Sequence, residues 1–304
     1  MIQAVLAVWI ASAVFIIRER RIVRLVIKLG VFSLLTSVCI MLLSAPDVAM
    51  AETVINAFFT IIFVVGFEKY YNVVGSSQPK KKKKIKYNVV PFIFTAAVAA
   101  LFIYFIPEHS APSVLKDEYM AHFKTDIGGE NAVTAIYLGY RMYDTLFEAL
   151  MLLASVMAVL HLSAHKDTYL TFGEHSEIKG SEVASVTIRI ICPILLLFGI
   201  YLVANGHISP GGGFQGGVVA ASFMVCRYLI HDIYDSRVDK LLTTEKIIFI
   251  AILLLTLCFI VHGLNDRVPI PRYVYLLAMN AMIGVKVFCG FFIVFYRFIV
   301  FERK

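Results

Sequence analysis

Three oxygen-bearing side chains follow one another at helical spacing inside an apolar stretch of the sequence. Glu52, Asn56 and Thr60 stand at positions i, i+4 and i+8, which places them on one face of a helix. Carboxylate and carbonyl oxygens are the ligands that hard cations prefer, and intramembrane carboxylates also relay protons. The stripe therefore predicts part of a cation path or a polar contact between two helices, and the pattern leaves both interpretations open.

Lys286 is a second ionisable residue that the sequence places deep inside an apolar segment. It lies about ten residues into the last such segment, too far from the end for its ammonium group to reach water easily. A buried Lys passes protons or sets the ionisation of a nearby carboxylate. Lys28 and Arg189 lie within about two turns of a segment end, where snorkelling is favoured, and Lys28 is kept as a candidate for the ion path.

The remaining polar residues form no pattern that is typical of a catalytic or metal centre. The five cysteines are far apart in sequence, and no CxxC pair or Ser/His/Asp arrangement occurs. His161 and His165 stand at i and i+4, but no carboxylate stands at a third ligand position. We therefore expect no enzyme activity, no bound metal and no cofactor.

The composition places these candidates in a membrane protein. Of 304 residues, 60% are hydrophobic and only 16% are charged, with a mean hydropathy of +0.81. Soluble domains carry about 25% charged residues. The net charge of +7 comes from basic residues beside apolar runs, which favours helix ends at a membrane surface and argues against nucleic acid. The fold class predicted is an all-α integral membrane protein.

Apolar stretches bounded by charge, Pro or Gly predict about nine transmembrane helices. They cover residues 1–17, 22–43, 47–67, 87–106, 145–162, 184–204, 213–233, 246–263 and 274–300. If the loop 18–24 is cytoplasmic, the cytoplasmic segments hold 20 of the 28 Lys and Arg residues and the external segments hold five. This bias predicts an external amino terminus and a cytoplasmic carboxyl terminus.

A dense cluster of glycines lies at residues 206–217, between two predicted helices. Residues 211–216 match the pattern GxGxxG, but no strand precedes them, so a nucleotide site is excluded. Pro210 is suited to the entry of a helix, and the small residues favour close approach of another helix. The pairs with GxxxG spacing are Gly212 with Gly216 and Gly213 with Gly217. His207, at the rim, is either a proton shuttle or a hydrogen-bonded loop residue.

Three short signatures stand in order along the chain. The first is Ala45-Pro46-Asp47-Val48-Ala49-Met50-Ala51-Glu52. The second runs from Gly128-Gly129-Glu130-Asn131 through Arg141, Asp144, Thr145 and Glu148, and the third is Gly206-His207 with Pro210-Gly211-Gly212-Gly213-Phe214-Gln215-Gly216-Gly217. They resemble the MbhD-type, MbhE-type and MnhB domains of Mrp-type multisubunit sodium/proton antiporters and of related membrane-bound hydrogenases.

The resemblance implies a division of the chain into three domains of three, two and four helices. They are an MbhD-like domain (1–74), an MbhE-like domain (87–165) and an MnhB-like domain (166–304), with a Lys-rich cytoplasmic linker at 75–86. The family implies a non-catalytic subunit in the plasma membrane of a prokaryote, within a complex that exchanges cytoplasmic Na+ for external H+. Its partners would be A-, C-, D-, E-, F- and G-like antiporter subunits. Two alternatives stay open, the equivalent subunit of a hydrogenase-type redox complex and a scaffold that conducts nothing.

The resemblance also extends the set of candidate residues. To the ion path it adds Asp47, Glu130, Arg141, Asp144 and Glu148, beside His207 from the glycine turn. As structural residues of the signatures it marks Pro46, Pro210, Gly211, Gly212, Gly213, Phe214, Gly216 and Gly217. Ala51 stands where the family often has Thr, and Asn56 where a small residue is common. These departures leave open whether Glu52 binds Na+ directly or relays protons.

Overall fold

The computed structural model describes residues 2–19, 21–74, 93, 96–98, 100, 101, 104, 114–162, 182–230, 238–263 and 271–300. Within these ranges the secondary structure is entirely helical, without a strand. The linker 75–86, most of the helix expected at 87–106, and His165 lie outside the described residues.

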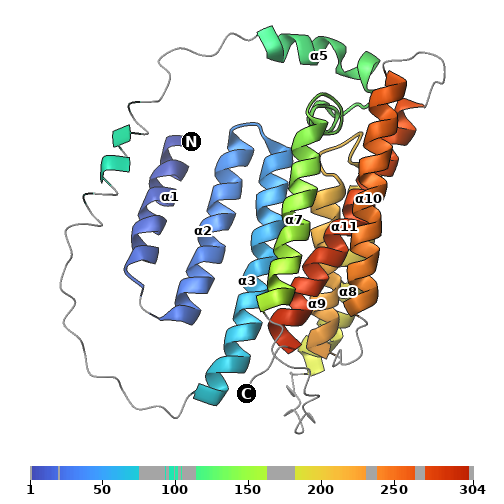
Figure 1. Ribbon diagram of the computed structural model, residues 1–304. Helices are drawn as coiled ribbons and strands as arrows, with labels where there is room; N and C mark the ends of the chain where they lie inside the picture. The colour runs from blue at the N-terminus through green and yellow to red at the C-terminus, as the bar shows by residue number, and fades with distance from the viewer. Residues whose placement is uncertain are drawn as a thin grey trace.

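The first three helices pack in chain order. They are α1 (Ile2–Ile17), α2 (Ile22–Leu42) and α3 (Pro46–Val74), with α2 between the other two (Figure 1). Ser44, at a φ of +62°, reverses the chain between α2 and α3. Pro46 then opens α3 at the first helical position, where a backbone N–H has no intrahelical partner.

The middle of the chain contains three short helices before the next long one. These are α5 (Val114–Asp126), α6 (Ala132–Ala135) and the π-helix η1 (Ile136–Tyr140), and the long helix that follows is α7 (Met142–Leu162). Asn131 caps α6, since its side-chain oxygen accepts hydrogen bonds from the backbone N–H groups of Val133 and Thr134. α5 occupies a segment that the sequence pattern treats as a connection between spans.

The last four helices form a bundle around α9 and α11. They are α8 (Glu182–Asn205), α9 (Gly213–Ile230), α10 (Val238–Gly263) and α11 (Arg272–Val300). A Cβ on Gly216 would lie 2.6 Å from the Gly199 carbonyl oxygen of α8, and one on Gly217 would lie 2.6 Å from the Gly284 carbonyl oxygen of α11. The glycines of α9 therefore allow two neighbouring backbones to approach closely.

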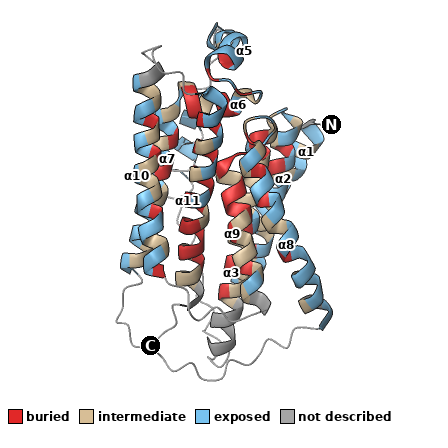
Figure 2. Ribbon diagram, turned by 90° about the vertical axis from the view of Figure 1, so that its right-hand side faces the viewer, coloured by how far each residue is buried: buried red, intermediate tan, exposed pale blue. Residues whose placement is uncertain are grey.

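α11 is the central helix of the molecule. It contacts α3, α7, α8, α9 and α10, and 61% of its apolar span is buried, against 17% for each of the other long spans (Figure 2). Its Phe291 packs on Phe58 of α3 at a ring-centroid distance of 5.0 Å. Aromatic packing therefore joins the first three helices to the last four.

Six of the described helices are long and apolar enough to cross a membrane. The spans are Ile22–Leu42, Pro46–Phe67, Met142–Leu162, Ser185–Asn205, Val238–Val261 and Arg272–Phe298. α1, with 16 residues, and α9, with 18, run alongside them. α1 begins at the end of the bundle where α5 and α6 lie, and α11 finishes at the opposite end (Figure 1). The expected all-helical membrane architecture is confirmed at the level of these six spans.

The largest difference from the sequence-based boundaries is the start of α10. The helix begins at Val238, whereas the sequence pattern places its start at residue 246. The earlier start has a physical reason, because Val238 is buried against Val156 and Ile293 and Glu245 pairs with Lys286 of α11. A segment expected to be a charged cytoplasmic connection is therefore helical.

Candidate functional site

The three sequence signatures meet at one end of the bundle, in a cluster that we call the signature junction (residues 47, 128–137, 206–213 and 280). Oδ1 of Asp47, at the start of α3, accepts hydrogen bonds from Asn131 Nδ2 and from the Gly211 backbone N–H, both at 3.1 Å. Asn131 Nδ2 also lies 3.0 Å from the Ser209 carbonyl oxygen. The buried Asp47 side chain therefore links the segments that carry the second and third signatures.

Backbone contacts strengthen the same junction. The N–H groups of Glu130 and Asn131 donate to the His207 carbonyl oxygen at 2.9 and 3.0 Å. Thr134 Oγ1 donates to the Gly206 carbonyl oxygen at 2.5 Å. His207 therefore takes part through its carbonyl, and its ring atom Nδ1 is buried without a hydrogen-bond partner among the described residues.

The glycine turn is shaped by the side chains around it. Gly211 and Gly212 have φ values of +144° and +150°, which favour glycine, and a Cβ on Gly212 would lie 2.5 Å from the Tyr137 hydroxyl. Asn280 Oδ1, on α11, accepts from the Gly213 N–H at 3.1 Å and from the Tyr137 hydroxyl at 3.4 Å. Tyr137 lies in η1, before the α7 span, and burial raises its pKa to about 12, so its hydroxyl remains a donor.

The π-helix η1 leaves carbonyl groups that side chains satisfy. Thr145 Oγ1 donates to the Tyr137 carbonyl oxygen at 2.5 Å, and the Tyr275 hydroxyl donates to the Leu138 carbonyl oxygen at 2.9 Å. π-helical turns are rare and frequently occur at functional sites. Here the turn holds Tyr137 beside the glycine turn, and it depends on Thr145 of α7 and Tyr275 of α11.

Glu52 lies in the interface between α2 and α3. Its Oε1 accepts hydrogen bonds from Ser33 Oγ at 3.1 Å and from Asn56 Nδ2 at 2.7 Å. Asn56 Nδ2 also donates to the Glu52 backbone carbonyl at 2.9 Å, so the amide presents its nitrogen to the carboxylate. This arrangement satisfies one oxygen of an intramembrane carboxylate with two donors. It suits a proton-carrying or packing role in this conformation, since Na+ requires oxygen ligands.

Thr60 and Lys28 lie away from the Glu52 carboxylate. Thr60 packs against Gly30 of α2, where an added Cβ would lie 3.0 Å from the Thr60 hydroxyl oxygen. Lys28 forms an ion pair with Glu19 at 2.5 Å, beside the turn between α1 and α2. The structure therefore brings Glu52 and Asn56 together, while Lys28 forms its ion pair near the start of α2.

Lys286 forms an ion pair with Glu245, a residue absent from the sequence-predicted set. Lys286 Nζ donates to Glu245 Oε1 at 2.9 Å, and the two side chains are 1% and 0% exposed. The ammonium group also lies 5.3 Å from the centroid of the Phe249 ring. Glu245 Oε2 is buried and has no hydrogen-bond partner among the described residues.

The acidic residues of α7 lie on its outer surface. Asp144 pairs with Arg141 at 2.5 Å, and both side chains are more than half exposed. Glu148 is exposed one turn further into the apolar span of α7. Glu130 is also exposed, next to the signature junction. These carboxylates face outward from the chain and contribute nothing to the Glu52 or Lys286 contacts.

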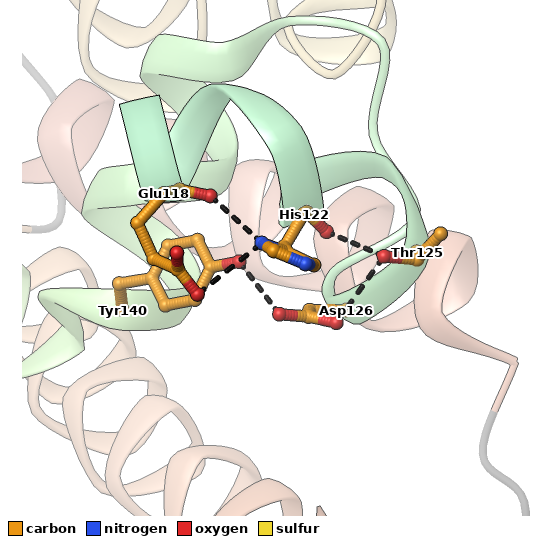
Figure 3. Close-up of polar contacts among 5 residues, drawn as sticks. All are labelled: Glu118, His122, Thr125, Asp126 and Tyr140. Carbon is orange, nitrogen blue, oxygen red and sulfur yellow. Dashed lines mark hydrogen bonds and ion pairs between the residues drawn. The ribbon is translucent and has the colours of Figure 1, made fainter. Parts of the chain in front are cut away.

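α5 covers the end of the bundle through a polar contact with η1 (Figure 3). The Tyr140 hydroxyl donates to Asp126 Oδ2 at 2.8 Å. The Tyr140 ring stacks on the Tyr119 ring, with a distance of 4.6 Å between the ring centroids. His122 and Glu118 form an exposed pair at 3.3 Å on the same helix. Partial burial and the Asp126 carboxylate raise the pKa of Tyr140 to about 12.

Within the part of the chain that the structure describes, no group of three or more His, Cys, Asp or Glu residues is placed to hold a metal ion. The polar residues that the sequence-based set omits are Ser33, Asn131, Tyr137, Glu245 and Asn280. Asn280 could have been found from the sequence, because it is a polar residue within the same apolar segment as Lys286. Asn131 belongs to the second signature, but neither its type nor its spacing predicts a role in the ion path.

Two protein-family models match the chain. Residues 7–71 match the MbhD family of MBH proteins, and residues 183–301 match a domain related to the MnhB subunit of Na+/H+ antiporters. Among curated proteins, the antiporter subunit named mnhA2 in Staphylococcus aureus strains JH9 and USA300 is 31% identical over 166 residues. That alignment covers 55% of this chain and 20% of the relative, so the chain spans about a fifth of its length.

Two solved structures have a similar fold. A chain of the Mrp complex from Dietzia sp. DQ12-45-1b aligns with a TM-score of 0.75 and 18% identity, covering 97% of this chain and 34% of that one. A chain of the archaeal membrane-bound sulfane sulfur reductase aligns with a TM-score of 0.54 and 24% identity, covering 68% of this chain and 94% of that one. The chain therefore contains a region that matches the MbhD family and a domain related to MnhB, it is similar to subunits of Mrp-type antiporters, and it is a multi-pass protein of a prokaryotic cell membrane.

Proposed function

We propose that this chain is a membrane subunit of a multisubunit cation/proton antiporter, exchanging cytoplasmic Na+ for external H+. The observation that carries the proposal is the Glu52 carboxylate, held inside the α3 span by Ser33 and Asn56. Intramembrane carboxylates are costly and mark ion pathways. The Na+/H+ antiporter description of the matching MnhB-related model supports the choice of ions. The proposed role needs no catalytic centre or cofactor in this chain.

The proposed topology has nine spans. To the six described spans the topology adds α1, α9 and a helix at 87–106, most of which lies outside the described residues. The strong excess of Lys and Arg in one set of connections supports a cytoplasmic carboxyl terminus and an external amino terminus. Under this topology the signature junction lies on the external side. The region 87–165 then forms the proposed MbhE-like domain.

The outward-facing acids of α7 support a multisubunit assembly. Glu148 is exposed within an apolar span, where direct contact with lipid tails is unfavourable for a carboxylate. A neighbouring membrane subunit that covers this face removes that cost. We therefore propose that Asp144 and Glu148 face partner subunits, namely the A-, C-, D-, E-, F- and G-like chains of such an antiporter.

The test compares two neutralising variants in the complete complex. Glu52→Gln is expected to abolish sodium-dependent proton movement in inverted membrane vesicles while the complex still co-purifies. Glu182→Gln removes an exposed carboxylate at the first residue of α8 and is expected to retain full activity. Full activity of the Glu52→Gln complex would remove Glu52 from the ion path. Antiport that survives deletion of the whole chain would contradict the proposed function.

The fold similarity to a chain of an archaeal respiratory complex favours a second candidate, the equivalent sodium-path subunit of a redox complex. Native purification of the complex followed by mass spectrometry separates the two. Companions limited to antiporter subunits support the antiporter, whereas iron-sulfur or nickel-iron subunits support the redox complex. Recovery of the chain without companions contradicts both.

A non-conducting scaffold is the third candidate, because Ser33 and Asn56 already satisfy Glu52 as a polar contact between helices. Under this role, Glu52→Gln weakens co-purification of the complex and leaves the transport of each assembled complex unchanged. Normalising transport to the amount of assembled complex distinguishes this outcome from a defect in the ion path.

A further inference from the structure

The Glu245 and Lys286 pair has no role in the sequence signatures and is buried in the last four helices. Both side chains are at most 1% exposed, and they form an ion pair with each other at 2.9 Å. Burying two charges costs several kcal/mol per ion unless geometry and further hydrogen bonds compensate. Such a pair is retained at a cost, which points to a role beyond stability.

The hydrogen bonding of Glu245 is unequal at its two oxygens. Oε1 accepts from Lys286, while Oε2 is buried without a hydrogen-bond partner among the residues described. A buried carboxylate oxygen without a partner is unfavourable until it gains a proton or a water molecule. A proton can therefore add to Oε2 while the bond from Lys286 to Oε1 stays in place.

Two further unpartnered polar atoms belong to the signature junction itself. Asn280 Nδ2 and His207 Nδ1 are buried without partners in the described structure. Asn280 precedes Lys286 by six residues on α11, which corresponds to about 9 Å toward the glycine turn. In the other direction, Glu245 lies about 10 Å from the first residue of α10. Buried water binds preferentially to polar groups of this kind.

We propose that Glu245 is a proton-carrying residue within the MnhB-related domain, on a route that runs from the glycine turn past Asn280 to the start of α10. The inference rests on the proposed antiporter function. A water-borne proton forms an O–H bond with Glu245 Oε2, and the Lys286 ammonium keeps its three protons and its bond to Oε1. Release breaks that O–H bond and returns the proton to water at the other side.

Other titratable groups also act on the pair. Lys246 follows Glu245 on α10, and the buried thiol of Cys289 stands three residues after Lys286 on α11. Phe249 offers its ring to the ammonium group. The carboxylate is thus in contact with Lys286, while Lys246, which is exposed, and Cys289 act on the pair at longer range. One added proton gives the pair a net charge of +1, and the cation–π interaction of Lys286 with the Phe249 ring partly stabilises this charge.

The decisive variants remove one charge or both from the complete complex. Glu245→Gln and Lys286→Met each leave one buried charge unpaired, and both are expected to assemble poorly. The double variant Glu245→Gln with Lys286→Met leaves no buried charge and is expected to assemble. If the pair only stabilises packing, the double variant regains full proton transport per assembled complex. A loss of at least tenfold is expected for a proton carrier, and full transport would overturn the proposal.

A second measurement applies even if the double variant fails to assemble. Infrared difference spectra of the wild-type complex between neutral and acidic pH are expected to contain a protonated-carboxyl band that shifts in Glu245→Asp. The matched variant Glu182→Asp, at the exposed start of α8, should leave that band in place. A spectrum unchanged by Glu245→Asp contradicts the inference. Because this readout needs no sodium gradient, it separates failure of the Glu245 role from failure of the antiporter function.

Discussion

Asp47 and Gly211 are hydrogen-bonded at 3.1 Å, although 164 residues separate them in the sequence. Asp47 lies in the region that matches the MbhD family, and Gly211 lies in the MnhB-related region. Asn131, from the segment between those regions, donates to the same carboxylate oxygen. One buried side chain therefore fixes the relative position of all three parts of the chain.

Replacing Asp47 tests this connection. Asp47→Ala leaves the buried Gly211 N–H without its acceptor and is expected to destabilise the protein by about 2 kcal/mol or more. Asp144→Ala breaks an exposed ion pair and should cost about 1 kcal/mol or less. The apparent melting temperature of the detergent-extracted complex measures both. Equal shifts for the two variants would argue against a central role for Asp47.

Gly212 is predicted to tolerate no side chain. Its φ of +150° disfavours other residues, and the added Cβ of Gly212→Ala would lie 2.5 Å from the Tyr137 hydroxyl. We expect Gly212→Ala to reduce the yield of folded protein several-fold. Gly290→Ala is the control, because its Cβ would meet only side-chain atoms of Leu152 and Val156, at 3.3 Å, and the helical φ of Gly290 suits any residue. Yield after membrane extraction is the measurement, and a normal yield for Gly212→Ala would contradict the prediction.

Two serines of α2 offer a matched test of the Glu52 contact. Ser33 donates to the Glu52 carboxylate, whereas Ser37, one turn away, donates to the Ser33 backbone carbonyl. Ser33→Ala removes a hydrogen bond to a charged group, worth about 1.5–3 kcal/mol, and is expected to slow transport several-fold. Ser37→Ala should transport as the wild type does. The initial rate of sodium-dependent proton movement in vesicles compares them, and similar rates would count against Ser33.

The contact between α5 and η1 should depend on Tyr140. Tyr140→Phe keeps the stack on Tyr119 but loses the bond to Asp126, so amide exchange in residues 114–126 should become faster. Tyr119→Phe is the control, since it retains both contacts. Hydrogen exchange followed by mass spectrometry reads out both variants. Unchanged exchange in Tyr140→Phe would show that the stack alone holds α5.

The same contact has a defined pH dependence. The pKa of Tyr140 is raised from 10.0 to about 12, so folding favours the protonated phenol. The stabilising contribution is complete below pH 10 and is lost as the pH rises through about 12. Exchange in α5 should therefore be accelerated at high pH beyond the intrinsic rate in the wild type, with no such extra increase in Tyr140→Phe. The difference between the two proteins provides the measurement.

The sequence pattern locates the helices well where apolar runs end at charge, Pro or Gly. The predicted helix 22–43 corresponds to Ile22–Leu42, and the predicted helix 274–300 corresponds to Arg272–Val300. The pattern misplaces the start of α10, because Asp239, Lys240 and Glu245 resemble a charged connection. The burial of Glu245 depends on a partner 41 residues later, and periodicity within one segment contains no information about that contact.

The sequence pattern also does not predict which residues meet in the signature junction. The signatures themselves are visible, but the bonds that join them connect residues 72 to 164 positions apart. The pattern does not detect α5 because its sequence is largely polar, and the buried Phe123 and the contact with Tyr140 help to hold it on the bundle. The Glu52 stripe is visible from spacing, whereas the direction of the Asn56 amide requires coordinates.

The central position of α11 also constrains how the protein is made. Five helices contact α11, yet it is the last helix of the described chain to leave the ribosome. Until α11 is made, these five helices lack one of the surfaces on which they pack, and Glu245 is synthesised before its partner Lys286. Insertion of α10 and α11 as one hairpin lets the two charges enter together and lowers the cost of each. Packing of the five helices around α11 is therefore complete only after α11 has been inserted.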